Sequence, residues 1–492
     1  MSATAAPAPP HRSAVREALQ KLSGDSLVYG LGAVGGRAVQ LLLVPILTRA
    51  LTPDAFGVGE LVMAYSQTAI LVLVLGMDGA LARFFHHEPD REARVRMASS
   101  SLWFRLVLAL AVGVIVALAA GPIASQLIGG DVYRKYLKIG AVTLPFTLIV
   151  LFGNDVLRVT FQPVKFITLN AVQTVLVGVL SVWFVSVKGL GVAGMLYGRL
   201  FGDAACAVLA LVLIRHSIRP WFSWPTLRRM LAYGAPALPA IIAFSTITSM
   251  DRYFLQRFRS LEDVGVYAIA VKFFAVVSIG VSGVQMAYGP FAYARAQSPE
   301  APRLFARVFA AFVGGASLIA LSVSLFAPEV VRLLVPPAYW NAAAPATWLA
   351  FAAVALGAYT IASIGIGLAL RTPILIECAV AGAIAALLAN LTLVPRWGAF
   401  GSGAATCLGY VVAATWTYLR AQQVHPFPYR GARLAAIYGV GLAVALAGQR
   451  WCPPGPAGIA VKLAAIGLFA VLCTWLGIWK ERGAVAAHAR VA

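Results

Sequence analysis

Residues 27–47 read LVYGLGAVGGRAVQLLLVPIL, an apolar stretch that contains one charge, Arg37. A helix needs about 20 mainly apolar residues to cross a hydrocarbon core of roughly 30 Å, and this stretch has that length. About fourteen such stretches follow one another along the chain, 60% of whose 492 residues are hydrophobic. The longest connections, around residues 84–99, 215–230 and 327–346, are too short for a soluble domain. The sequence therefore predicts an all-α, polytopic membrane protein with about 14 transmembrane helices.

The formal net charge of +21 comes from 39 basic and 18 acidic residues. Most of the basic residues lie in alternate connections between the apolar stretches, beginning with the N-terminal one. Because basic residues favour the cytoplasmic side, both termini are predicted to be cytoplasmic. Residues 1–26 have no apolar region before a cleavage site and are expected to remain as a cytoplasmic tail. The excess charge is a signal of topology and gives no reason to expect a nucleic-acid partner.

The two halves of the chain share a sequence pattern. Each has a Tyr-Gly pair, an apolar run, an arginine, and an acidic residue shortly before a Gly-Val pair. The residues are Tyr29-Gly30, Arg49 and Asp54-Ala55-Phe56-Gly57-Val58 in the first half, and Tyr233-Gly234, Arg257 and Asp263-Val264-Gly265-Val266 in the second. The pattern indicates a duplicated six-helix unit with a substrate site between the copies, although chance similarity of apolar segments is the alternative.

This interpretation divides the chain into four parts. Residues 1–26 form the tail, 27–220 an N-terminal six-helix lobe, 221–420 a C-terminal six-helix lobe, and 421–492 two additional helices with a cytoplasmic tail. Within the first lobe, Gly194, Gly198 and Gly202 recur every four residues, which favours close internal packing of that helix over dimerisation. Gly234, Pro236 and Pro239 make the seventh span a candidate bending element, because proline removes a backbone hydrogen bond.

Several charges inside the predicted spans have a simple structural explanation. A charged side chain at the bilayer centre costs about 2.5–3.5 kcal/mol on insertion scales. Such a group therefore needs an ion-pair partner or a side chain long enough to reach the membrane interface. Arg199 and Asp203 are four residues apart, and Asp155 and Arg158 are three apart, so each pair can neutralise itself locally. Arg105 and Lys462 lie near the ends of spans, and we interpret them as side chains whose long stems carry the charge to the interface.

Other charges remain unexplained by local pairing. Arg37 and Lys272 have no acidic residue three or four positions away, and Asp251-Arg252 lies toward the outer end of the seventh span. The simplest arrangement points Arg37, Arg252 and Lys272 into a shared water-filled cavity, where each cation within about 4 Å of a phosphate gains roughly 4 kcal/mol at an effective dielectric near 20. The alternative is a purely structural network in which these cations pair with Asp251 or with Asp78, near the end of the second span.

The sequence lacks the motifs of several other functions. It contains no phosphate-binding Gly-x-x-x-x-Gly-Lys-Ser/Thr loop, no metal-ligand cluster and no nucleophile with a base at a recognisable spacing. The five cysteines show no ligand spacing. We therefore expect no catalytic residues, no cofactor and no metal site, and we do not expect an enzyme.

Four motifs in the leading helices resemble the opening of bacterial polysaccharide-transporter proteins. These proteins are the O-antigen and exopolysaccharide flippases of the multidrug/oligosaccharidyl-lipid/polysaccharide (MOP) exporter superfamily. The motifs are Tyr29-Gly30-Leu31-Gly32, the run from Leu47 to Gly57, Leu75-Gly76-Met77-Asp78 and Ala82-Arg83-Phe84-Phe85. Tyr233-Gly234-Ala235-Pro236, Asp251-Arg252-Tyr253-Phe254-Leu255 and Val264-Gly265-Val266-Tyr267 are similar to the second repeat of that family.

The resemblance implies a fold and a function. The fold would be two six-helix lobes in a V around a central cavity, with two further C-terminal helices. The substrate would be an undecaprenyl-diphosphate-linked oligosaccharide, flipped across the bacterial inner membrane as the lobes rock, with its lipid tail along an apolar groove. Carried over as cavity residues are Arg37, Arg252 and Lys272, with Arg49 and Arg83 as further candidates, and Asp251 and Asp78 as coupling or charge-pairing groups. Expected partners are membrane lipid, a polysaccharide polymerase and other assembly proteins.

Two alternatives remain at this point. A cation-coupled exporter of small molecules or drugs would share the architecture, but it would favour acidic over basic cavity residues. A membrane-embedded polysaccharide polymerase would need a sizeable outer loop with catalytic charges. The largest predicted outer loop, around residues 328–345, contains only Glu329 and Arg332 as charges.

Overall fold

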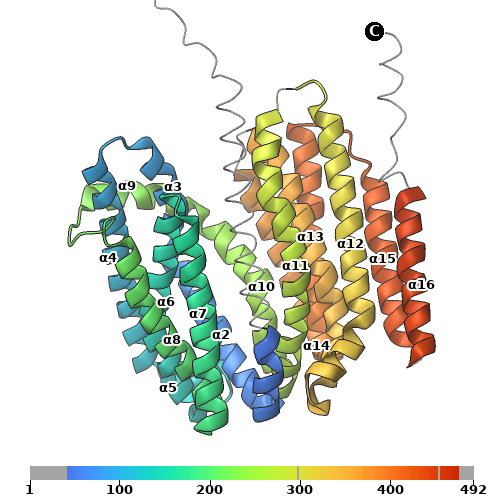
Figure 1. Cartoon of the computed structure of the whole chain (residues 1–492), viewed down its shortest axis with the longest axis horizontal. Coiled ribbons are helices and arrows are strands. Elements are labelled where there is room, and N and C mark those ends of the chain that lie inside the picture. Colours follow the sequence, from blue (N-terminus) through green and yellow to red (C-terminus); the bar gives the residue numbers. More distant parts are fainter. Residues whose placement is uncertain (1–40, 296–297, 370, 372, 453–454, 476–492) are drawn as a thin grey trace, which may run out of the picture.

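The computed structural model describes residues 41–295, 298–369, 371, 373–452 and 455–475 (Figure 1). Within these ranges every regular element is a helix, and 12 of them are long and apolar enough to cross a membrane. The predicted all-α, polytopic class is confirmed. A further apolar helix, Leu41–Ala50, forms the end of the first predicted span.

The helices fall into two bundles and a C-terminal pair (Figure 1). The first bundle contains α2 (Pro53–Val74), α3 (Met77–His87), α4 (Arg91–Leu118), α5 (Ala120–Leu127), α6 (Arg134–Val159), α7 (Pro163–Val182) and α8 (Gly191–Ile214). The second contains α10 (Leu238–Phe258), α11 (Leu261–Arg295), α12 (Ala301–Leu334), α13 (Ala343–Leu368) and α14 (Pro373–Val424). Helices α15 (Gly431–Trp451) and α16 (Pro456–Trp475) lie at the outer edge of the second bundle, where both contact α12.

Helix α14 supplies two membrane crossings. Its 52 residues would extend about 78 Å at 1.5 Å per residue, far more than the roughly 30 Å of a hydrocarbon core. The helix breaks at Gly398, whose φ of 54° and ψ of −132° are open to glycine but not to other residues. The two halves then fold against each other, with Gly382 packed on Ala413. With α14 counted twice and Leu41–Ala50 included, the architecture agrees with about fourteen spans.

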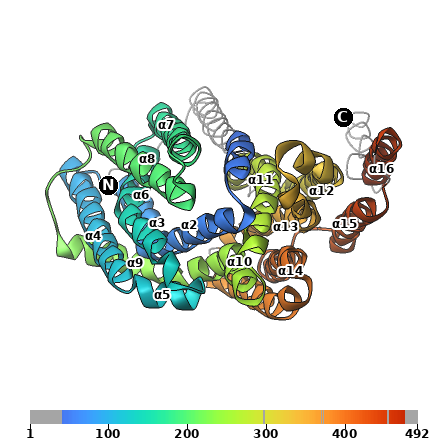
Figure 2. The same cartoon turned by 90° about the horizontal axis from the view of Figure 1, so that it is seen from below.

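The bundles meet where α2 crosses α11, and the view from below shows α2 running toward α10 and α11 (Figure 2). A Cβ added at Gly57 would lie 2.1 Å from the carbonyl oxygen of Leu261, and one added at Gly265 would lie 2.0 Å from that of Pro53. Gly57 and Gly265 are the equivalent glycines of the repeated pattern. Such a reciprocal contact is what two copies of one unit produce when they pack around a pseudo-two-fold axis.

The predicted internal packing of the glycine stripe is confirmed, whereas the bending of the seventh span stays a prediction. The Gly194, Gly198 and Gly202 stripe of α8 lies against α7 and the π-helical turn Trp183–Val187 that follows it, so the stripe packs internally. A 3-10 turn, Ala235–Ala237, contains Pro236 and lies between Gly234 and Pro239. It joins α10 to the preceding helix α9 (Trp224–Gly234).

Two predicted connections contain more helix than expected. Residues 224–234 form α9, which starts with Pro225 in its first turn and buries Leu227 and Met230 as it packs on α3 and α4. Helix α12 continues through Pro328 to Leu334 and is followed by a 3-10 segment, Pro337–Ala342, so the predicted outer loop is short. In both places, packing against other helices stabilises helical structure outside the apolar stretches from which the spans were predicted.

Candidate functional site

A cavity of about 430 Å³ lies between the two bundles. Its walls come from Leu41–Ala50, α2, α7 and α8 on one side, and from α10 and α11 on the other. Its polar lining residues are Glu60, Gln67, Ser181, Arg199, Thr248, Ser249, Arg252 and Lys272. Among the described residues, the lining thus carries three cations and one carboxylate, and both bundles contribute to it.

Lys272 and Glu60 form an ion pair across the cavity wall. The Nζ of Lys272, on α11, lies 3.1 Å from Oε1 of Glu60, on α2, so the pair joins the two bundles. The side chains are 26% and 11% exposed, so they line the cavity and are not sealed inside a bundle. Lys272 therefore keeps partial access to the cavity, whereas Glu60 is largely buried.

Arg252 and Asp251 share one turn of α10 but face different surroundings. The Nη1 of Arg252 donates to the carbonyl oxygen of Thr248 at 3.3 Å and lies 3.5 Å from Oδ1 of Asp251. The other carboxylate oxygen of Asp251 accepts a 2.6 Å hydrogen bond from the hydroxyl of Tyr267. Asp251 therefore anchors Arg252 from inside the second bundle, and Arg252 lines the cavity.

Arg199 is held in a similar way by the first bundle. Its Nε lies 3.5 Å from Oδ2 of Asp203, one turn further along α8. The buried carboxylate of Asp203 also accepts hydrogen bonds from Thr147 at 2.5 Å and from Gln173 at 2.8 Å. The local Arg199–Asp203 pairing predicted from the sequence is confirmed, but Arg199 also lines the cavity, which the sequence interpretation did not foresee.

The predicted site residues are only partly brought together. Arg252 and Lys272 line the same cavity, whereas Arg49, Arg83 and Asp78 are exposed and lie outside its lining. Arg83 instead stacks its guanidinium 4.9 Å from the ring centre of Tyr233. Arg37 lies outside the described residues.

The alternative hypothesis of a purely structural ion-pair network predicted Asp251 or Asp78 as the partner of Lys272. This prediction is wrong, because Lys272 pairs with Glu60. Glu60 was missed by sequence reasoning. Its position two turns into the apolar helix that begins at Pro53 was the signal that could have identified it.

The interpretation of Arg105 and Lys462 as interface-seeking side chains is wrong. Arg105 is fully buried, and its Nη1 donates at 3.0 Å to Asp155, which also accepts from Arg158 at 2.6 Å as predicted. Lys462 is buried against α12, where it pairs with Glu329. Both cations find carboxylates on neighbouring helices, which removes the need to reach the interface.

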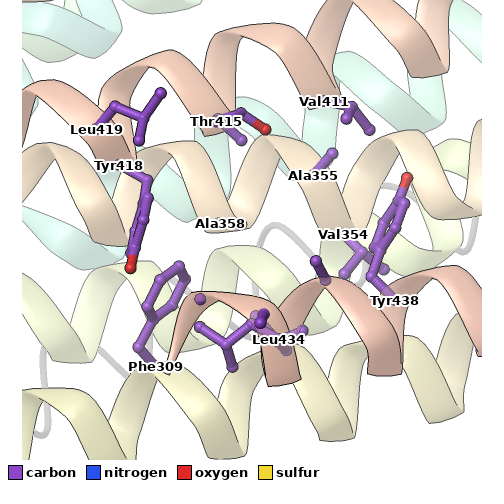
Figure 3. Close-up of a pocket in the computed structure, with 15 residues that line it drawn as sticks. Phe309, Val354, Ala355, Ala358, Val411, Thr415, Tyr418, Leu419, Leu434 and Tyr438 are labelled. Carbon is purple, nitrogen blue, oxygen red and sulfur yellow. The ribbon is translucent and has the colours of Figure 1, made fainter. Parts of the chain in front are cut away.

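A second, apolar pocket of about 490 Å³ lies among α12, α13, α14 and α15 (Figure 3). Phe309 and Leu434 lie on one side of it, opposite Ala358 and Thr415, and the rings of Tyr418 and Tyr438 stand at either end (Figure 3). No described residue lines both this pocket and the cationic cavity. Within the described ranges no three His, Cys, Asp or Glu side chains come close enough together to hold a metal ion.

The arrangement of two helical bundles is shared with solved membrane transporters. The structure is similar to that of the lipid II flippase MurJ in an inward closed conformation, with a TM-score of 0.73 and 10% identity over 91% of this chain and 98% of that one. It is also similar to an inward-facing multidrug resistance MATE family transporter of the MOP superfamily, with a TM-score of 0.64 and 17% identity over 81% of this chain and 95% of that one.

The sequence matches the family described as polysaccharide biosynthesis protein over residues 23–291, which is more than half of the chain. The protein belongs to that family. It is 24% identical over 253 residues to the succinoglycan biosynthesis transport protein ExoT of Rhizobium meliloti, a match that covers 50% of this chain and 48% of ExoT. Matches to curated relatives span between 48% and 66% of the relatives' own lengths.

Proposed function

We propose that this protein is a flippase that moves undecaprenyl-diphosphate-linked oligosaccharide repeat units across the bacterial inner membrane for surface or exopolysaccharide synthesis. The observation that carries the proposal is the cationic cavity between the bundles, with Arg199 from one bundle and Arg252 and Lys272 from the other. Membership of the polysaccharide biosynthesis family and the fold shared with a lipid II flippase support the substrate class.

A diphosphate fits the charge of this cavity. Each cation within about 4 Å of a phosphate contributes roughly 4 kcal/mol at an effective dielectric near 20, which offsets the desolvation of the anion. Glu60 holds Lys272 in place while the cavity is empty. When the ammonium of Lys272 turns from Glu60 to a phosphate oxygen, the largely buried carboxylate of Glu60 loses its partner, a cost that binding of the anion must offset.

The lipid part of the substrate needs an apolar path. The pocket beside α15 is lined almost entirely by aliphatic and aromatic side chains, and an isoprenoid chain gains about 0.8 kcal/mol for each methylene-sized group that it buries there. In this proposal the diphosphate and the sugars occupy the cavity between the bundles, and the lipid tail occupies the apolar pocket among α12–α15.

The proposed topology has both termini in the cytoplasm, with the lobes at residues 27–220 and 221–420 acting as the moving bodies. A polysaccharide polymerase and other assembly proteins are the proposed partners. The short outer segment after α12 offers no room for the catalytic loop of a polymerase. We propose a transporter and not an enzyme.

A pair of single substitutions tests the role of the cavity charges. Lys272→Gln lowers the positive charge of the cavity, whereas Glu60→Gln raises it, and both break the same ion pair. Binding of a polyprenyl-diphosphate oligosaccharide to the purified protein is expected to weaken at least about tenfold in Lys272→Gln, the effect of about 1.4 kcal/mol. Glu60→Gln is expected to bind as tightly as the natural protein or more tightly.

Lys462→Gln is the matched control, because this lysine also pairs with a glutamate but lies outside the cavity. It is expected to leave binding within about twofold of the natural value. Equal weakening in Lys272→Gln and Glu60→Gln would show that the pair is only structural. Drug resistance in cells that express the protein, with no rescue of polysaccharide export in a flippase-deficient strain, would instead support the small-molecule exporter.

A further inference from the structure

A third pocket, of about 360 Å³, lies at one end of the first bundle. The end of α3, the start of α4, the end of α6 and the segment after α8 meet there. Its lining residues are Phe85, His86, Arg91, Arg94, Val95, Val159, Thr160, Phe161, His216 and Ser217. None of them lines the cationic cavity or the apolar pocket.

The charge of this pocket has one sign. The described residues that line it include two arginines, two histidines and no carboxylate. Asp90, which precedes α4, uses both carboxylate oxygens to cap that helix by accepting from the backbone N–H groups of Glu92 and Ala93. Arg215 donates from Nε to Nε2 of His216 at 3.2 Å, which leaves Nδ1 of that ring to donate to a ligand.

Arg94 has hydrogen-bonding capacity that its described neighbours do not use. Its guanidinium lies 5.4 Å from the ring centre of Phe85. Its Nε is shielded from solvent and has no hydrogen-bond partner among the described residues. A buried N–H without an acceptor costs about 1–3 kcal/mol, so an acceptor in the pocket would relieve this cost. Arginine is also the side chain best suited to bind phosphate oxygens in pairs.

The length of α4 and the charged residues of its first turns indicate that the pocket lies near the level of lipid headgroups. The 28 residues of α4 extend about 42 Å, so the first turns of this helix project beyond a hydrocarbon core of roughly 30 Å. Phe161, at the rim, is 67% exposed. Its backbone is in the left-handed region with a φ of 53°, and its ring centre lies 5.3 Å from that of His86. Cations below an exposed aromatic ring suit an amphiphilic anion.

We propose that this pocket is a phosphate-binding site that holds the headgroup of an anionic phospholipid. Arg91 and Arg94 would bind the phosphate oxygens, the two histidines would flank them, and Phe161 would lie against the glycerol and the first methylenes of the lipid. The site is separate from the proposed transport cavity, and its occupancy requires no transported substrate.

The test uses the full chain, purified in a neutral detergent, and measures the affinity of dioctanoyl phosphatidylglycerol. The comparison is with dioctanoyl phosphatidylcholine, which has no net charge, and with inorganic phosphate. Arg91→Gln/Arg94→Gln is expected to weaken binding of phosphatidylglycerol about tenfold or more, because two charge-assisted contacts are lost. Arg96→Gln removes a charge from the same end of α4 outside the pocket and is expected to change affinity less than about twofold.

The outcomes separate the sources of the phosphate group. Selective loss of phosphatidylglycerol binding in the double variant supports the lipid site. The same loss for inorganic phosphate also supports a phosphate site and identifies its source as soluble. Equal weakening in Arg96→Gln, or no preference of the natural protein for phosphatidylglycerol over phosphatidylcholine, overturns the proposal. If the double variant does not fold, His86→Gln/His216→Gln changes two exposed pocket residues and has the same expected direction.

Discussion

At the residue scale, several charges inside the predicted spans are neutralised between helices and not within one helix. Arg105 reaches Asp155 from α4 to α6, Lys272 reaches Glu60 from α11 to α2, and Lys462 reaches Glu329 from α16 to α12. Sequence spacing reveals only partners that lie three or four residues apart on one helix. For this reason the local pairs of Arg158 and Arg199 could be predicted from the sequence, and the partners of Arg105, Lys272 and Lys462 could not.

Because sequence spacing reveals only local partners, it also determines which cavity residues could be predicted. Lys272 has no acidic residue three or four positions away and Arg252 has only the adjacent Asp251, so the sequence indicates both as candidates, and the structure places both on the cavity wall. Arg199 was set aside because Asp203 explains it locally, yet a paired arginine can still present its guanidinium to a cavity. A carboxylate partner therefore does not remove a cation from a candidate binding site.

Asp155 offers a test of buried pairing. Asp155→Asn leaves the fully buried Arg105 without its counter-ion, and loss of one partner of a buried ion pair costs about 3–5 kcal/mol. We expect a clearly lower midpoint of thermal unfolding in detergent. Arg158→Gln, which removes the 56% exposed partner of the same carboxylate, is expected to cost less than about 1 kcal/mol. An equal decrease of the thermal midpoint in the two variants would contradict the difference in burial between Arg105 and Arg158.

At the element scale, the lengths of the apolar stretches predicted the number of helices well, but not where each helix begins and ends. The repeated Gly-Val pattern indicated that α2 and α11 are equivalent, and the packing of their glycines agrees with this. The sequence did not reveal α9, because its apolar residues gain their stability only from packing on α3 and α4. The break at Gly398 agrees with the predicted number of spans, because it divides α14 into two crossings.

The contact between α2 and α11 leads to a prediction about Gly57. Gly57→Ala would place a Cβ 2.1 Å from the carbonyl oxygen of Leu261, so the two helices must separate. We expect a lower thermal midpoint and less export, because the bundles can no longer approach as closely at this end. Gly79→Ala is the matched control, since nothing described lies within 4 Å of its added Cβ. Export at the natural level in Gly57→Ala would argue against a functional role for this contact.

At the scale of the whole molecule, α2 contacts the second bundle at two levels. Gly57 meets α11 near the start of the helix, and Thr68, about 16 Å further along its axis, meets α10 through a 3.4 Å contact between its hydroxyl and that of Ser245. Between these two levels, Glu60 of α2 pairs with Lys272 of α11, and the cationic cavity lies beside this part of the helix. If the bundles move as two bodies, opening the cavity to either face of the membrane must break one of these contacts.

This arrangement predicts the effect of a cross-link between the bundles. Thr68→Cys/Ser245→Cys places two thiols where hydroxyl oxygens now lie 3.4 Å apart, a separation from which a disulfide forms with small adjustments. Under oxidising conditions we expect export to fall by about tenfold or more, because the closed contact resists the motion, and a reductant is expected to restore it. Each single cysteine variant is the control and should export normally under both conditions. Four natural cysteines, Cys206, Cys378, Cys407 and Cys473, are buried, and Cys452→Ser in all variants removes the fifth, which is only partly buried. Undiminished export by the fully cross-linked protein would mean that transport does not require α2 and α10 to separate.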